Sequence, residues 1–362
     1  MRILGIETSC DETSAAVVED GTIILSNVIS SSLPLHAKTG GIIPEVAARQ
    51  QIKYIIPVIE KSMENATALS LSRRGKLRMD DIDAIAVTVG PGLIGSLLVG
   101  VETAKTLAYV WNKPIIPVNH LIGHIYANFI STFNSSFDPE LRTEGQLSTL
   151  NFPAIVLLVS GGHTDLLLME DHGKIKWLGG TRDDAAGEAF DKIARLLGLP
   201  YPGGPSIERE ALNGNPKAFN FPRPMLGSGN FDFSFSGLKT AVYRTIQSLN
   251  PNDQRLMTKD LAASVQQSIV DVLVKKTIRV AQKYKVKSIL LSGGVSANQN
   301  LRDELKLNAR RYPPAGGLNA EFFAPAKNLC TDNAAMIASA AFFNYHPKPW
   351  KQITADPELY FD

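Results

Sequence analysis

Two stretches of the chain repeat the same order of apolar and polar positions. Ile3–Ile6 and Ala15–Val18 have the pattern of short buried strands around the polar turn ETSCDETS, and Ala154–Val159 and Leu166–Met169 enclose SGGHTD in the same way. In each case another strand-like run and then helical periodicity follow. This pattern predicts two α/β halves related by an internal duplication, although two unrelated hairpins would give the same local pattern.

The longest apolar region, Ala84–Trp111, has the length of a membrane span but not its composition. Glycines interrupt it, and Glu102 and Lys105 fall within its second half. A membrane span needs about 20 mostly apolar residues without such charges. We therefore interpret the region as a buried strand, a glycine loop and a helix, and we expect no membrane-spanning segment.

A third glycine turn lies at Leu290–Leu301. The helical run Asp260–Tyr284 and the strand Ser288–Leu291 precede it, and the pattern predicts a helix around Asn298–Leu307. Free backbone N–H groups and the helix dipole at such a junction attract phosphate. One turn of this kind is weak evidence, but three, each after an apolar strand, favour a nucleotide-binding α/β protein.

Two histidines, His120 and His124, lie four residues apart in the apolar run NHLIGHIYA. On a helix the two imidazoles would share one face and could bind one metal ion. The alternative is a pair of hydrogen-bonded core residues. The three residues between them supply no general base of the kind found in HExxH peptidases, so a peptidase of that type is disfavoured.

A metal site needs a third ligand, and Asp332 in NLCTDNAAM is the best acidic candidate. It follows the apolar run Phe322–Ala324 and precedes a helix predicted over Asn333–Phe343. A carboxylate at this place also suits a helix N-cap, and the local pattern alone favours the cap.

Composition narrows the class of protein without defining its chemistry. The chain has 362 residues, is 44% hydrophobic and carries a formal net charge of +2. These values suit two globular lobes without a strong global field, and a local basic strip for nucleic acid remains compatible with them. The two cysteines, Cys10 and Cys330, form no CxxC motif, so reduced thiols are expected. Three polar stretches have the composition of surface loops: Thr67–Asp81, Ser131–Leu150 and Arg310–Asn319.

Nine stretches, taken in order along the chain, resemble the TsaD family of tRNA N6-adenosine threonylcarbamoyltransferases. They are GIETSCDETSAAVV, GGIIPEVAAR, TVGPGLIGSLLVG, NHLIGHI, LLVSGGHTDL, DDAAGEAFDKIARLLGLPYPGGP, FSFSGLKTA, LSGGVSANQNLR and CTDNAAM. They run from Gly5 to Met336, so the resemblance covers nearly the whole chain. Together the stretches are far more specific than any single glycine turn.

The resemblance implies the ASKHA fold of actin, Hsp70 and sugar kinases, an α/β fold with two duplicated lobes and a nucleotide cleft between them. We expect residues 1–115 with a C-terminal region 327–362 to form one lobe and residues 116–326 the other. It also implies a reaction. The threonylcarbamoyl group passes from threonylcarbamoyl-adenylate to N6 of the adenosine 3′-adjacent to the anticodon, in tRNAs that read codons starting with A, and AMP is released.

The family's motifs also imply roles for particular residues. His120, His124 and Asp332 become the ligands of one divalent ion, iron or zinc, against the cap interpretation of Asp332. Asp11 and Glu188 are hypotheses for the base that removes the amine proton. The substrate-binding residues that the resemblance implies are Ser9, Leu158, Val159, Ser160, Gly161, Gly162, Asp191, Gly204 and Asn298.

One position departs from part of the family. Leu158 stands where archaeal and eukaryotic relatives have a metal-ligating tyrosine. Its presence indicates the bacterial or organellar branch, in which solvent or substrate takes the fourth position on the ion.

The resemblance further implies partners: the tRNA substrate, a TsaB-like inactive paralogue and a TsaE-like ATPase, with a homodimer as the alternative. The apolar face of the helix Glu45–Lys61 is either a contact surface for a partner or ordinary core. No leader peptide is recognised, which favours the cytoplasm. An ASKHA kinase or ATPase and a non-catalytic scaffold are the competing classes. The histidine pair disfavours the kinase, because such enzymes hold magnesium with oxygen ligands.

Overall fold

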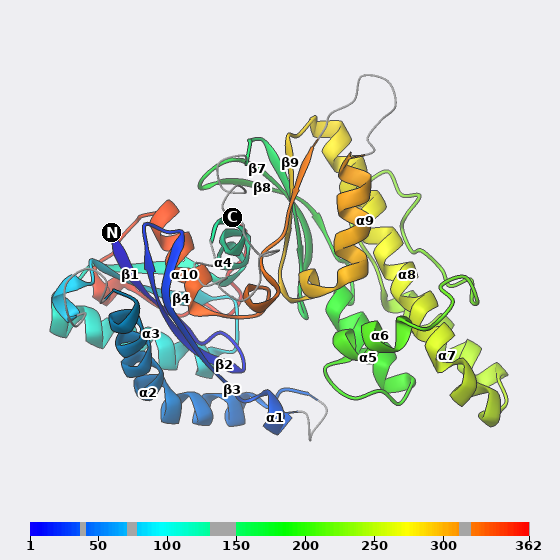
Figure 1. Cartoon of the computed structure of the whole chain (residues 1–362), viewed down its shortest axis with the longest axis horizontal. Helices are drawn as coiled ribbons and strands as arrows, with labels where there is room; N and C mark the ends of the chain where they lie inside the picture. The colour runs from blue at the N-terminus through cyan, green and yellow to red at the C-terminus, as the bar shows by residue number, and fades with distance from the viewer. Residues whose placement is uncertain (37–40, 71–77, 131–149, 311–319, 362) are drawn as a thin grey trace. The chain divides into compact units, whose positions relative to one another are not determined.

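A computed structural model describes residues 1–36, 41–70, 78–130, 150–310 and 320–361 of the chain. Most of the three polar stretches predicted as loops therefore lies outside the described residues. The chain divides into two compact units, residues 1–149 with 325–362 and residues 150–324. Figure 1 shows the elements of both, coloured along the chain. No helix among the described residues combines the length and the apolar character that crossing a membrane requires.

The first unit contains a five-stranded sheet with the order β3-β2-β1-β4-β5. β1, β2 and β3 form an antiparallel meander, and β4 and β5 extend the sheet in parallel on the other side of β1. The strands are β1 (Arg2–Glu7), β2 (Glu12–Glu19), β3 (Ile23–Ser31), β4 (Ala84–Gly90) and β5 (Ile115–Asn119). The helices are α1 (Leu33–His36), α2 (Pro44–Ser70), α3 (Ile94–Trp111), α4 (His120–Tyr126) and α10 (Ala334–Phe343), with short 3-10 turns η1 (Met79–Asp81), η2 (Ala127–Phe129), η5 (Lys327–Leu329) and η6 (Trp350–Gln352).

The second unit repeats this plan. Its sheet order is β8-β7-β6-β9-β10, with β6, β7 and β8 antiparallel and β9 and β10 parallel to β6. The strands are β6 (Ala154–Val159), β7 (Thr164–Asp171), β8 (Lys174–Gly180), β9 (Ser288–Ser292) and β10 (Glu321–Phe323). The helices are α5 (Ala186–Leu196), α6 (Gly203–Ala211), α7 (Ser236–Ser248), α8 (Pro251–Tyr284) and α9 (Gln299–Arg310), with the 3-10 turn η4 (Gly294–Ala297).

The duplication predicted from the two hairpins is confirmed strand for strand. Each unit has a three-stranded antiparallel meander whose first strand pairs, on its free edge, with a parallel strand that follows a helix. The region Ala84–Trp111 is a buried strand and a helix, as its interrupted apolar pattern indicates. Two such α/β halves are the ASKHA architecture that the resemblance implies.

Helices cover both faces of the first sheet. Successive residues of β1 point to opposite faces, so they show which helices lie on each. Leu4 and Ile6 join the apolar core with residues of α2 and α3. Gly5 faces α10 instead, and a Cβ at Gly5 would lie only 2.3 Å from the carbonyl oxygen of Ala334. The glycine therefore lets the alanine-rich α10 lie directly on the sheet, which fixes the turn that contains Asp332.

The first unit extends past the predicted boundary at residue 115. β5 continues the parallel ladder of β4, and α4 packs against α10, so the histidine helix belongs to this unit. The β4–β5 pairing and the α4–α10 contact join residues 115–126 to the first unit, although the position of these residues in the sequence did not indicate it. On the C-terminal side the division falls after residue 324, close to the predicted 326.

Candidate metal centre

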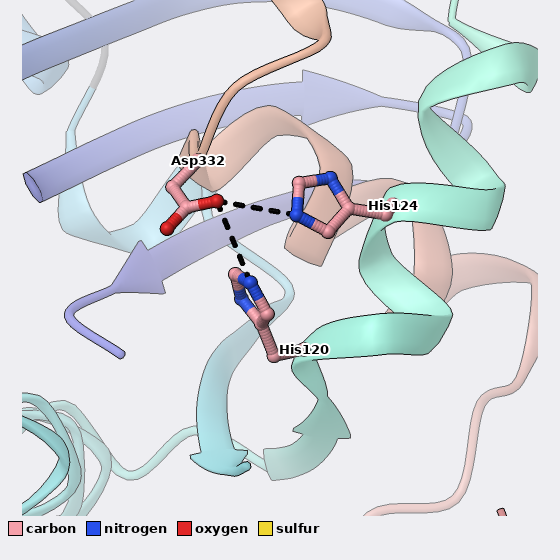
Figure 2. Close-up of side chains that lie close together, drawn as sticks. All are labelled: His120, His124 and Asp332. Carbon is pink, nitrogen blue, oxygen red and sulfur yellow. Dashed lines mark ion pairs between the residues drawn. The ribbon is translucent and has the colours of Figure 1, made fainter. Parts of the chain in front are cut away.

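The two histidines are positioned by the junction between β5 and α4. Asn119 ends β5, and its side-chain oxygen accepts hydrogen bonds from the backbone N–H groups of Leu121 (2.8 Å) and Ile122 (3.4 Å), which caps α4. His120 is therefore the first residue of a helix, and His124 follows one turn later. Figure 2 shows both imidazoles projecting from α4 toward the same place.

Asp332 completes the cluster, and its interpretation as a helix cap is wrong. The cap of α10 is Asn333, whose side-chain oxygen accepts a hydrogen bond from the N–H of Met336 at 3.1 Å. The Oδ1 atom of Asp332 instead lies 3.4 Å from Nε2 of His120 and 3.2 Å from Nε2 of His124 (Figure 2). One ligand atom from each residue lies within 4.8 Å of the others.

These donor atoms fit a divalent transition-metal ion. Tetrahedral ligands about 2.0–2.1 Å from an ion are separated from one another by about 3.3 Å, close to the two distances from Asp332 to the imidazoles. Two neutral imidazoles and one carboxylate suit zinc and iron alike. Three protein ligands also leave a coordination position for substrate, as catalytic sites require.

Glu7, at the end of β1, holds the far side of the His120 ring. Its Oε2 lies 3.0 Å from Nδ1 of His120 and accepts a hydrogen bond from the hydroxyl of Thr88, while its Oε1 accepts one from the N–H of Ser9. Glu7 is fully buried. An acceptor at Nδ1 keeps that nitrogen protonated and leaves Nε2 free to bind metal. Glu7 was not among the site residues predicted from the sequence. The only signal was an acid at the end of an otherwise apolar strand.

The electrostatics of the cluster couple metal binding to proton release. Burial alone would lower the pKa of His120, but the carboxylates of Asp332 and Glu7 hold that pKa well above its usual range. Burial alone would raise the pKa of Asp332, but the two imidazoles hold it well below its usual range. The opposite charges of the imidazoles and carboxylates therefore favour a proton on the cluster, and a cation that binds there has to displace it.

Ser9 and Asp11, both predicted near substrate, lie in the same unit as the triad. The hydroxyl of Ser9 is 3.2 Å from Nδ1 of His120, and Ser9 is buried. Ser9 therefore contacts the His120 ring and is not exposed to solvent. Asp11 lines a polar cavity of about 320 Å³ with Thr13, Ser30 to Ser32 and Tyr54 among its walls.

The predicted adenylate residues lie together in the second unit. The carbonyl of Ser160 accepts a hydrogen bond from Gly187 at the start of α5, and the Asp191 carboxylate accepts one from the N–H of Gly203 at 2.7 Å. Burial raises the pKa of Asp191. These contacts join the β6–β7 turn, α5 and the start of α6, where Gly204 lies.

The β6–β7 turn offers open backbone at its glycines only. The N–H of Ser160 already donates to the carbonyl of His163 at 2.8 Å. Gly161 and Gly162 are exposed, and a Cβ on either would meet nothing within 4 Å. Leu158 and Val159 are fully buried, so their side chains are not accessible to a ligand.

Glu188 and Asn298 are engaged with neighbouring side chains. Glu188 pairs with Lys192 one turn along α5, at 2.9 Å. Asn298 accepts a hydrogen bond from the N–H of Leu301 and donates one to Gln266 at 2.8 Å, so it caps α9. Any contact that either makes with a ligand has to compete with these bonds.

The fold and the histidine–carboxylate cluster define the class as an ASKHA-type α/β protein with a triad of side chains that could hold a metal ion. A crystal structure of full-length HypF in its phosphate- and nucleotide-bound form matches 95% of this chain and 46% of that chain, with a TM-score of 0.58 at 12% identity, which supports the fold alone. The family model for TsaD, tRNA N6-adenosine threonylcarbamoyltransferase, matches residues 23–339.

Curated bacterial relatives agree with the family model. A tRNA N6-adenosine threonylcarbamoyltransferase of Moorella thermoacetica is 48% identical over 95% of this chain and 92% of its own length. One of Desulfitobacterium hafniense is 48% identical over 99% of this chain and 97% of its own length. The chain therefore belongs to the TsaD family, whose members are transferases that modify tRNA. This membership favours the transferase over the kinase and scaffold classes considered from the sequence.

Proposed function

We propose that this protein transfers the threonylcarbamoyl group of threonylcarbamoyl-adenylate to N6 of the adenosine 3′-adjacent to the anticodon in tRNAs reading ANN codons. The bond between the carbamoyl carbon and the phosphate oxygen breaks, a bond from that carbon to N6 forms, and AMP leaves. The observation that carries this proposal is the convergence of His120, His124 and Asp332 in a chain that matches the TsaD family.

The difficulty of this reaction lies in its nucleophile. The lone pair of an exocyclic adenine amine is delocalised into the ring, so the carbonyl under attack has to be activated. A divalent iron or zinc ion in the triad would polarise that carbonyl and stabilise negative charge on its oxygen, worth several kcal/mol. Glu7 serves this step by holding His120 in the tautomer that binds metal. The phosphate of the adenylate is already a good leaving group.

Asp11 is the better supported of the two proposed bases. It lies in the unit of the metal triad and lines a polar cavity of about 320 Å³, although none of the three triad residues lines that cavity. Glu188 would first have to release Lys192. We expect Asp11→Asn to slow transfer at saturating adenylate and Glu188→Gln to change it less. Unchanged rates in both variants would exclude both residues as bases.

The adenylate itself is proposed to bind in the second unit. Gly161 and Gly162 supply exposed backbone N–H groups for its phosphate, and Asp191 and Gly204 hold its ribose and base side, with Asn298 on the adenosine. This assignment uses fewer side chains than the set expected from the sequence. Leu158 and Val159 are buried and can contribute only backbone groups, and the N–H of Ser160 already donates to His163 within the turn. Competition between AMP and the adenylate for wild type and Gly161→Ala would test the phosphate contact.

A partner surface is proposed on α2 and α3, for a TsaB-like paralogue acting with a TsaE-like ATPase in the cytoplasm. Ile52 and Ile56 on α2 are 65% and 49% exposed, and Ile94 and Leu98 on α3 are 49% and 44% exposed. Ile55, which also lies on α2, is buried in the core. A second copy of this chain is the alternative occupant. Size-exclusion chromatography of Ile52→Glu with and without the paralogue distinguishes the two.

Reconstitution tests the whole proposal. Purified protein, the adenylate, unmodified tRNA and the two partner proteins are combined, and nucleosides are read by mass spectrometry. We expect the threonylcarbamoyl nucleoside to form with wild type and to fall to background with His124→Ala. Formation of the nucleoside at the wild-type rate by His124→Ala would contradict the proposal.

A further inference from the structure

An acid-free stretch of the second unit concentrates positive charge. Between Val272 and Arg302 the chain has seven Lys or Arg residues and no Asp or Glu. Since the whole chain has a formal net charge of +2, removing these seven cations leaves −5 for the remainder. The C-terminal half of α8 and the segment that follows it are therefore a local concentration of positive charge in a chain whose remainder is net negative.

Three of these cations share one face of α8. Lys275, Arg279 and Lys283 are spaced four residues apart, which aligns them along the helix. Lys275 and Lys283 are exposed, and Arg279 is partly buried. In the part of the chain that the structure describes, neither of the two lysines has a carboxylate within ion-pair distance. Their charges are thus available to a ligand.

The segment 226–233 is fixed against this face by two other cationic contacts. Lys276, which is fully buried, donates to the hydroxyl of Ser228 at 3.0 Å and to the carbonyl of Asp232. Arg279 donates to the carbonyls of Ser228 (2.9 Å) and Asn230 (2.5 Å). These two cations therefore have a structural role, which holds the segment in place beside the exposed lysines.

Phe231 and the edge strand β8 complete the surface. The ring centre of Phe231 lies 5.0 Å from Nζ of Lys283. A Cβ on Gly179 of β8 would lie 2.8 Å from the backbone of Phe231, so the segment also touches this strand. Lys176 of β8 pairs with the core residue Leu168, which places its exposed side chain on the side of the sheet that α8 covers.

We propose that Lys176, Lys275 and Lys283 with Phe231, the α8 basic face, bind the phosphate backbone of the tRNA substrate. This inference rests on the proposed function for the choice of tRNA. Cations that neutralise phosphates release counterions and so contribute affinity, and an aromatic ring among them is a platform on which an unpaired base stacks. Charge alone would also attract an acidic protein, but the aromatic ring favours RNA.

The test removes the charge without touching the metal triad. The triple variant Lys176→Gln, Lys275→Gln and Lys283→Gln is compared with wild type for binding of unmodified tRNA at salt concentrations from about 0.05 to 0.3 M. Each lost phosphate contact lowers the slope of log affinity against log salt by about 0.7–0.9, so three lower it by about 2–3. At 0.15 M salt the affinity should fall on the order of 30- to 100-fold. The KM for tRNA should rise while kcat at saturating tRNA is unchanged.

A matched control separates location from net charge. Lys61→Gln, Lys306→Gln and Lys351→Gln remove three exposed lysines elsewhere, and this variant should bind tRNA within about twofold of wild type at 0.15 M salt. Equal affinity and salt slope for both triple variants would overturn the proposal. So would a basic-face variant that loses binding to anionic vesicles or to polyglutamate but keeps its affinity for tRNA.

The two proposals fail in different ways. Wild type that forms the modified nucleoside, together with a basic-face variant of unchanged KM for tRNA, leaves the transferase function intact and removes this surface. Wild type that binds tRNA with the predicted salt slope but never forms the nucleoside refutes the function and retains the surface.

Discussion

Replacing Glu7 by glutamine should weaken metal binding although Glu7 is not a ligand. Both carboxylate oxygens are occupied, one by the Ser9 N–H and the other by the Thr88 hydroxyl and Nδ1 of His120. A glutamine has one acceptor and one donor. If its NH2 faces Ser9, two donors oppose each other. If it faces His120, the imidazole must accept at Nδ1 and carry its proton on Nε2, where metal has to bind.

The expected loss follows from the role of such partners in other metal sites. Removing the acceptor behind a ligating histidine costs about 10- to 100-fold in metal affinity, which corresponds to about 1.4–2.7 kcal/mol. Full burial of Glu7 places the effect toward the upper end, because no water replaces the lost contact.

Competition with a chromophoric chelator for Co(II) or Zn(II) measures this change directly. Glu19→Gln is the matched control. Glu19 is a partly buried carboxylate of the same sheet, and it pairs with Arg2 at the opposite end of β1 from Glu7. We expect wild-type affinity for Glu19→Gln and the loss above for Glu7→Gln, with unchanged circular dichroism in both. Affinity of folded Glu7→Gln within about twofold of wild type would refute the tautomer argument.

Three further predictions concern stability. Asn119→Ala removes the cap of α4, so the free energy of unfolding should fall by about 1 kcal/mol in urea titration, and metal affinity should fall with it because His120 begins that helix. Lys276→Met leaves partly buried acceptors without a donor, and the same titration should show a loss of about 1 kcal/mol. Burial, with the negative charges of Asp332 and Asp11, raises the pKa of Glu12 to about 10 from an ordinary 4.5. The folded metal-free protein therefore retains a proton that the unfolded chain loses, so this group's contribution to stability falls as pH rises from about 4.5 to about 10. Glu12→Gln removes this fall, and melting curves at pH 5 and pH 8 should show the variant gaining on wild type only at the higher pH; an equal difference at both pH values would contradict the assignment.

The elements of the fold could be predicted where hydrophobic period alone determines them. The paired hairpins and the Ala84–Trp111 segment have apolar runs of strand and helix length, and the structure confirms them. The lobe boundary could not be placed, because β5 and α4 join the first unit through a strand pairing and a helix contact that are distant in sequence.

Two residues of the metal triad could be predicted from local sequence, but the third, Asp332, could not. The i,i+4 spacing of the histidines indicates a shared helix face from sequence alone. Asp332 and Asn333 are adjacent polar residues before a helix, and only the packing of α10 decides that Asn333 caps it while Asp332 faces the imidazoles. The role of Glu7 could not be predicted from the sequence, because the partner of a histidine nitrogen is fixed by three-dimensional contact between β1 and α4.

The most direct test of this account is nucleoside mass spectrometry of tRNA after reaction with metal-loaded protein, with protein stripped by a chelator, and with stripped protein given back its ion. We predict that stripping abolishes formation of the threonylcarbamoyl nucleoside, that restoring the ion recovers it in wild type, and that Asp332→Asn is not recovered at the same ion concentration. Transfer at an undiminished rate by the stripped protein would contradict the claim that these three side chains hold the ion on which the chemistry depends.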